Sequence, residues 1–153
     1  MLILVSLMLA MESLGQERPV LPNNPRAEAV TVSATIVTGD GQSPRLVFTL
    51  TNRGDTEVEV FRHTLWRGNI ILVLAEDRPG AILREVLFPD DLPAGTWILS
   101  PGDSVDDEVA LDSRFPRIRS MRDQGTLVLF WSLRVQYADH TTGPRVGGFL
   151  TLK

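Results

Sequence analysis

The sequence predicts an all-β protein, an immunoglobulin-like antiparallel β-sandwich of about eight to nine strands. Most apolar runs alternate with polar residues at period two, the spacing of a half-buried strand. Gly, Pro, Asn and Asp stand between these runs at short intervals, where turns are expected. A small β-barrel is the alternative that the same pattern leaves open.

Composition limits the functions open to the chain. Its 153 residues, 43% of them hydrophobic, suffice for one domain with its own core. The net charge of −4 gives no reason to expect nucleic-acid binding. The sequence has no cysteine, which excludes disulfides, thiolate nucleophiles and cysteine-ligated zinc. Of the 15 basic residues only Lys153 is a lysine, a bias that we attribute to a GC-rich bacterial genome.

The N-terminal segment resembles an export signal. Met1–Met11 is apolar apart from Ser6, and it is much shorter than the roughly 20 residues of a membrane-spanning helix. Ser13-Leu14-Gly15 places small residues at the −3 and −1 positions before Gln16. We therefore expect a signal peptide over residues 1–15, delivery to the periplasm or the outside, and no stable membrane span after cleavage. The apolar run lacks a preceding basic residue, so a start further upstream, or an ordinary first strand or buried helix, stays open.

Residues 16–27 contain three prolines without periodicity and predict an extended linker, followed by a single domain over 28–153. The first strand is expected over Glu28–Val37. The second, Arg45–Asn52, turns Leu46, Phe48 and Leu50 inward. The turn Asn52–Asp55 then leads to Thr56–Arg62, which we expect to pair with the second strand as a hairpin.

The middle of the chain is less regular. His63–Asn69 is expected to be a loop, and Asn69–Ala75 is apolar on both faces, as in a strand covered from both sides. Ile82–Phe88 suits either a strand or a helical turn, and Thr96–Leu99 a short edge strand. Ser100–Asp103 carries the Pro-Gly pair of a type II turn.

The strand Ser104–Leu111 should face inward through Val105, Val109 and Leu111. Asp107 shares their parity, which predicts a bulge or a strand end. Beyond it, Arg114–Asp123 has Phe115, Ile118 and Met121 at helical spacing, which favours a helical turn or an irregular crossover.

The stretch Gly125–Asp139 predicts the central strand. Its inward face is uniformly large and apolar and consists of Leu127, Leu129, Trp131, Leu133, Val135 and Tyr137. Its other face begins apolar and becomes polar, in the order Val128, Phe130, Ser132, Arg134 and Gln136. Arg145–Leu152 is the expected last strand. Its Gly147-Gly148 pair suggests either an edge for strand addition or room for Trp131.

Three stretches resemble secreted immunoglobulin-like modules: Leu46–Val60, Leu99–Asp112 and Gly125–Tyr137. The shared pattern is a strand ending in Asn and a Gly turn, a Pro-Gly turn before a strand, and a long strand led by Gly. It is similar to the pro-regions of deuterolysin-type zinc peptidases and to bacterial proteinase-inhibitor modules. The resemblance implies an immunoglobulin-like fold and a free-standing inhibitor or binding module, because the chain has no HExxH motif. It implies no functional residue.

Few residues are candidates for chemistry. His140 follows Asp139 and precedes two threonines, but neighbours in a turn rarely reach the geometry of a base and its nucleophile. His63 is expected to be a loop residue. The carboxylates of Asp90-Asp91 and Asp106-Asp107-Glu108 match no calcium loop and are expected to be solvated. We predict neither a catalytic residue nor a cofactor or metal.

The sequence therefore favours an exported, non-enzymatic module that binds another protein or has a structural role. The partner is expected to be a protein of the cell envelope or a secreted peptidase, and a proteinase inhibitor is the sharper alternative. A metal-binding or hydrolytic enzyme is the third. Loops around residues 62–68 and 89–97 are the expected contact surface. The candidate contact residues, if exposed, are two tryptophans and four arginines: Trp66, Trp97, Arg114, Arg117, Arg119 and Arg122.

Overall fold

The computed structural model describes residues 28–39, 42–65, 69–76, 82–83 and 94–152, so the expected signal segment and linker lie outside the described residues. The described chain is mostly strand, in three antiparallel sheets, and the all-β prediction is confirmed. Its strands are β1 (Val30–Val37), β2 (Arg45–Asn52), β3 (Val58–Phe61), β4 (Ile71–Glu76), β5 (Ile82–Leu83), β6 (Thr96–Leu99), β7 (Ser104–Ala110), β8 (Leu127–Gln136) and β9 (Thr142–Leu152).

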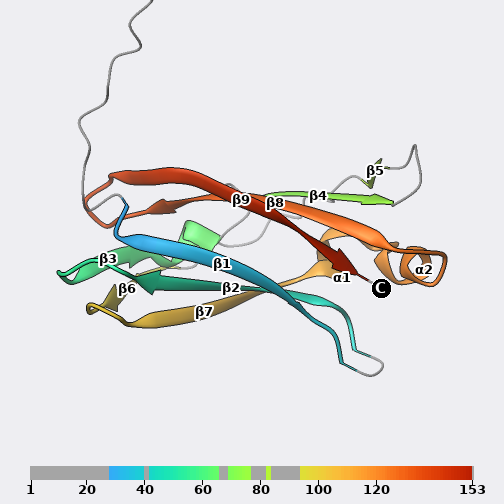
Figure 1. Cartoon of the computed structure of the whole chain (residues 1–153), viewed down its shortest axis with the longest axis horizontal. Coiled ribbons are helices and arrows are strands. Elements are labelled where there is room, and N and C mark those ends of the chain that lie inside the picture. The colour runs from blue at the N-terminus through green and yellow to red at the C-terminus, as the bar shows by residue number, and fades with distance from the viewer. Residues whose placement is uncertain (1–27, 40–41, 66–68, 77–81, 84–93, 153) are drawn as a thin grey trace, which may run out of the picture.

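The sheets are arranged in two layers. One sheet has the order β1-β2-β7 and another the order β5-β4-β8-β9, while β3 and β6 form a ribbon of their own. Figure 1 shows β4, β8 and β9 lying over β1, β2 and β7, with the β3–β6 ribbon at one end and two short helices at the other. The layers follow from alternation, since each strand has one apolar face to bury.

The core lies between these layers. Every inward residue predicted for β8 and its end is buried, from Leu127 to Tyr137. From the opposite layer, β2 contributes Leu46, Phe48 and Leu50, each with no exposed surface. Phe48 meets Trp131 edge to face, with ring centroids 5.4 Å apart. The predicted inward faces of both strands are therefore confirmed.

The predicted hairpin between the second and third strands is wrong. Both edges of β2 are already paired, with β1 on one side and β7 on the other. The chain therefore leaves this sheet after Asn52, and β3 pairs with β6 instead, with Val58 opposite Leu99. A local turn signal shows where a chain reverses but not which edges are free.

Asn52 fixes the point at which the chain leaves the β1-β2-β7 sheet. It has no exposed surface, and its side-chain amide donates to the carbonyls of Thr56 and Leu99 at 2.8 and 2.9 Å. Its Oδ1 accepts from the backbone N–H of Gly54 at 2.9 Å. A buried amide satisfied in this way ties the end of β2 to the turn and to β6.

Two expectations about single strands are also wrong. No bulge or strand end occurs at Asp107: β7 pairs with β2 without interruption, and the half-buried Asp107 lies opposite Phe48 while accepting a hydrogen bond from the N–H of Glu108. β4 is not covered from both sides, because Leu72 and Leu74 are buried whereas Ile71 is 52% exposed.

The predicted type II turn at Ser100–Asp103 and the helical crossover are confirmed. Gly102 has φ of 88°, and the N–H of Asp103 donates to the carbonyl of Ser100 at 2.9 Å, as in a type II turn. The crossover forms two short helices, α1 (Leu111–Arg114) and α2 (Ile118–Arg122), which bury Phe115, Ile118 and Met121. In the described ranges no helix has the length and apolar character needed to cross a membrane.

The glycine pair of β9 makes room for Trp131. A Cβ at Gly148 would lie 3.2 to 3.4 Å from three atoms of the Trp131 indole. At Gly147 a Cβ would lie 2.5 Å from the Trp131 carbonyl oxygen. Close packing of β8 on β9 therefore accounts for both glycines.

Candidate functional site

Of the two tryptophans predicted as contact residues, the structure describes one. Trp66 lies outside the described residues. Trp97, in β6, is half-buried and packs against the core. The guanidinium carbon of Arg62 lies 5.5 Å from the centre of its ring, a cation–π contact. Part of the Trp97 ring is thus already engaged within the chain.

The four crossover arginines do not form one surface. Arg114 is buried, with 6% of its surface exposed, so it belongs to the packing around α1. Arg117 and Arg119 are exposed, and Arg122 is half-buried. Of the four, only Arg117 and Arg119 are therefore exposed enough to contact a partner.

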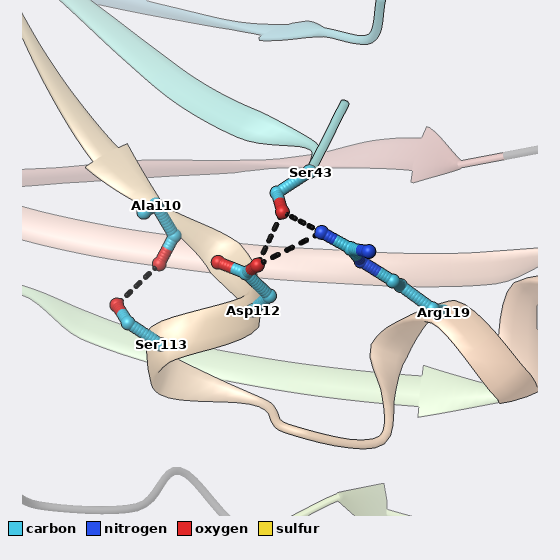
Figure 2. A network of polar contacts seen from close by, with 5 residues as sticks. All are labelled: Ser43, Ala110, Asp112, Ser113 and Arg119. Atoms are coloured by element: carbon cyan, nitrogen blue, oxygen red, sulfur yellow. Dashed lines mark hydrogen bonds and ion pairs between the residues drawn. The ribbon is translucent and has the colours of Figure 1, made fainter. Parts of the chain in front are cut away.

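Arg119 is held by a small polar network (Figure 2). Ser43 Oγ donates to Asp112 Oδ2 and accepts from Arg119 Nη2, and this nitrogen lies 3.3 Å from the same carboxylate oxygen. The hydrogen bond from Ser43, more than the nearby charge of Arg119, lowers the pKa of Asp112 below its usual value. The three groups satisfy one another, and they connect the segment before β2 to both helices.

The two histidines, far apart in the sequence, contact the same aromatic ring. His63 lies in a 3₁₀ turn, η1 (Arg62–Leu65), and stacks on Phe61 with centroids 4.7 Å apart. His140 lies in the β8–β9 turn, and its ring centroid is 5.7 Å from that of Phe61. A pocket of about 220 Å³ opens here, lined by Phe61, His63, Gln136, Tyr137, His140, Thr141 and Thr142.

Two polar side chains of this pocket, His63 and Gln136, are linked to each other and to Asn69. His63 Nε2 lies 2.6 Å from Gln136 Oε1, and Gln136 Nε2 donates to Asn69 Oδ1 at 2.7 Å. Asn69 in turn donates to the carbonyl of His63 at 3.0 Å. This closed ring of contacts fixes η1 against the end of β8.

The pocket lacks the alignment of a catalytic triad. Asp139 Oδ1 accepts from both the N–H and the hydroxyl of Thr141, at 2.9 and 2.6 Å. The carboxylate therefore holds the turn, and the threonine hydroxyl points to it instead of to an imidazole. A nucleophile needs its base within hydrogen-bond reach.

A second hollow is also lined by Tyr137. Its volume is about 280 Å³, and Glu57, Glu59 and Asp139 are among its lining residues. Burial raises the pKa of the Tyr137 phenol, and the charge of Asp139 adds to this. No cluster of three or more side chains suited to metal binding occurs among the described residues.

In the part of the chain that the structure describes, a group of exposed apolar side chains lies on the outer side of the four-stranded sheet. Ile71 is 52% exposed, Phe130 47% and Phe149 67%. Val73 and Phe149 both lie opposite Phe130, so these three form one row across β4, β8 and β9. The two phenylalanine rings lie 6.3 Å apart between centroids. We call these four residues, Ile71, Val73, Phe130 and Phe149, the Phe130–Phe149 face.

Sequence reasoning missed this surface. Alternation predicts the outward position of Phe130 correctly, but it indicates Phe149 only as part of the last strand. The available signal was parity: both phenylalanines occupy outward positions of strands that follow one another through a short turn. A hairpin register between them would have placed the two rings side by side.

Comparison with known proteins adds little. No family model matches the chain, and a search of curated proteins finds no match. Among solved structures, a protein from Archaeoglobus fulgidus matches at 10% sequence identity and a TM-score of 0.38, covering 81% of this chain and 94% of its own. At this TM-score the similarity carries no argument about fold or function.

Proposed function

We propose that the protein is an exported, non-enzymatic binding module that recognises another protein through the Phe130–Phe149 face. One observation carries the proposal: three large apolar side chains, Ile71, Phe130 and Phe149, are each about half exposed or more on neighbouring strands. Contiguous apolar surface of this kind is typical of interaction sites, and scattered single residues are not. Aromatic residues are also enriched at interface centres.

The apolar contacts would supply only part of the binding free energy. Burying a whole Ile or Phe side chain is worth roughly 1.5–3 kcal/mol, and about half of each side chain remains to be covered, which gives about 3–4 kcal/mol for three. Association itself costs at least about 4 kcal/mol. A stable complex therefore needs further contacts around the Phe130–Phe149 face.

The proposed architecture is an immunoglobulin-like sandwich over residues 28–153. In such domains the first, second and fifth strands share one sheet, and the third, sixth and seventh share the other. The strand orders β1-β2-β7 and β5-β4-β8-β9 correspond to this arrangement when the β3–β6 ribbon is set aside and β5 is taken as an additional edge strand. The outer face of such a sheet is a rigid platform for a binding surface.

Export is the second part of the proposal. The apolar segment before Ser13 and the linker over residues 16–27 support a cleaved signal peptide and a periplasmic or secreted domain. Fractionation of cells expressing the full chain, with N-terminal sequencing of the product, tests this. A product found in the cytosol and still beginning at Met1 would refute it.

Site-specific crosslinking tests the binding face. We expect a photoactivatable residue placed at Phe149 to give one discrete protein adduct in the cell of origin. The matched control is Ile98, a 62% exposed residue of β6 outside this face, which should give none. Equal adducts at both positions, or none at either, would refute the proposed interface. A peptidase as the adduct would favour the alternative of a proteinase inhibitor, which inhibition of that peptidase by the purified domain would then test.

A further inference from the structure

We propose that the partner presents carboxylates beside its apolar contact residues, and that Arg134 and Arg145 bind them. This inference rests on the proposed function, since it names the chemistry of the partner at the same face. Arg134 and Arg145 lie directly opposite each other on β8 and β9. Both are exposed, and both have the outward parity of Phe130 and Phe149.

The arginines are close to the apolar row. Residues four apart on a strand are about 13–14 Å apart, and one outward-facing row lies between Arg134 and Phe130. The row between them is small, with Ser132 opposite Gly147. Arg145 extends back over it, because its Nη1 lies 3.4 Å from Ser132 Oγ. A cation therefore lies one row from the two aromatic rings.

Among the residues that the structure describes, neither arginine has an anionic partner. The ion pairs found among the described residues join Arg45 to Glu108 and Arg119 to Asp112. Like charges placed directly opposite in a sheet repel each other. Arg134 and Arg145 thus form a doubly charged edge of the face that an external anion would neutralise.

A carboxylate-bearing protein fits this edge best. Arginine binds carboxylates through paired N–H donors, which adds both affinity and a fixed orientation. An anionic membrane would also be attracted to these two arginines. A membrane is an extended anionic surface that also meets the rest of the molecule, whose net charge of −4 repels it, whereas a local carboxylate on a protein meets mainly the two arginines. Charge complementarity therefore favours a protein partner with a local acidic group.

The experiment begins with the protein that crosslinks at position 149. The adduct is digested, and the attached segment is sequenced by mass spectrometry. The purified partner is then titrated with the wild-type domain, with the double variant Arg134→Gln/Arg145→Gln, and with Arg53→Gln/Arg117→Gln. The last pair removes the same charge from exposed positions outside the face. Thermal unfolding confirms that each variant is folded, which we expect because R134Q/R145Q removes a repulsion.

We expect Asp or Glu in the crosslinked segment, and roughly tenfold or greater weakening by R134Q/R145Q, with a smaller dependence on salt. R53Q/R117Q should bind as the wild type does. Equal affinity of all three proteins would overturn this inference and leave the proposed interface intact. Equal weakening by both double variants would overturn it too, because net charge alone would then explain the loss.

Two further outcomes are decisive. Absence of any adduct specific to position 149 would remove the proposed interface and this inference with it. Binding of the wild-type domain to vesicles that contain phosphatidylglycerol, lost in R134Q/R145Q, would show that the arginines serve a lipid surface and would overturn the assignment to a protein.

Discussion

Gly147 is the position at which a single methyl group should most directly disturb the four-stranded sheet. It lies in β9 opposite Ser132, where a Cβ would stand 2.5 Å from the carbonyl oxygen of Trp131. Real Cβ atoms essentially never approach another atom closer than 3.0 Å. The oxygen belongs to the backbone, so no side-chain rotation can relieve the contact. Gly147→Ala must therefore push β9 away from β8 by several tenths of an ångström.

The size of the effect follows from two opposing terms. Forcing an extra methyl group into a packed site costs roughly 1–3 kcal/mol. The Gly-to-Ala change returns about 0.4–1 kcal/mol by restricting the unfolded chain. We expect a net loss of about 1–2 kcal/mol in the free energy of unfolding. For a chain of this size, at about 2–4 °C per kcal/mol, that lowers Tm by roughly 2–8 °C.

Two other glycines provide matched controls. At Gly148 the Cβ would meet the Trp131 indole at 3.2–3.4 Å, a side chain that can shift slightly, so Gly148→Ala should cost less. At Gly125 a Cβ would meet nothing within 4 Å, and Gly125→Ala should be neutral or stabilising by up to about 1 kcal/mol. Urea unfolding at 25 °C, followed by circular dichroism, measures all three. If Gly147→Ala were as stable as Gly125→Ala, the pairing of β8 with β9 in this register would be refuted.

Two further predictions concern His140 and Asp112. His140 has φ of 64°, a conformation that Asn also tolerates, so His140→Asn keeps the turn and removes only the ring contact with Phe61. We expect a loss of about 0.5 kcal/mol by urea unfolding, and an unchanged stability would show that this ring contributes nothing to the fold. The pKa of Asp112 is lowered in the folded state, so the charged carboxylate stabilises the protein at pH values above its usual pKa of 3.8. This stabilisation disappears as the pH falls through the folded-state pKa. Asp112→Asn should therefore be less stable than the wild type at pH 7 and equally stable near pH 2, and an equal difference at both pH values would contradict the role of the carboxylate.

Sequence reasoning predicted the local features of the fold and missed its pairing. Alternation identified the inward faces of β2 and β8, because side-chain parity is a property of a single strand. The partner of β3 is decided by edges that distant segments occupy, and no local signal reports them. The same limit applies to the histidines: only the paths of η1 and the β8–β9 turn bring His63 and His140 to Phe61.

The candidate interface was missed for a related reason. Apolar residues on both faces of Asn69–Ala75 indicated a strand covered from both sides, yet they equally suit a strand with one face in the core and the other in an interface. The two cases differ only in what lies outside the sheet, which the sequence of one strand does not contain. The exposed phenylalanine row became visible only once β8 and β9 were paired and Phe130 was placed opposite Phe149.

In the central strand β8, residues that stabilise the fold therefore alternate with residues proposed to bind the partner. Its inward residues, among them Trp131, are buried in the core, and its outward residues Phe130 and Arg134 lie on the proposed interface. Substitutions at inward positions should lower Tm, whereas substitutions at outward positions should weaken binding and leave Tm almost unchanged. A shift of one residue in register would exchange these two sets, because parity alternates at every position. Gly147, which fixes the approach of β9 to β8, therefore supports both the core and the arrangement of the binding face.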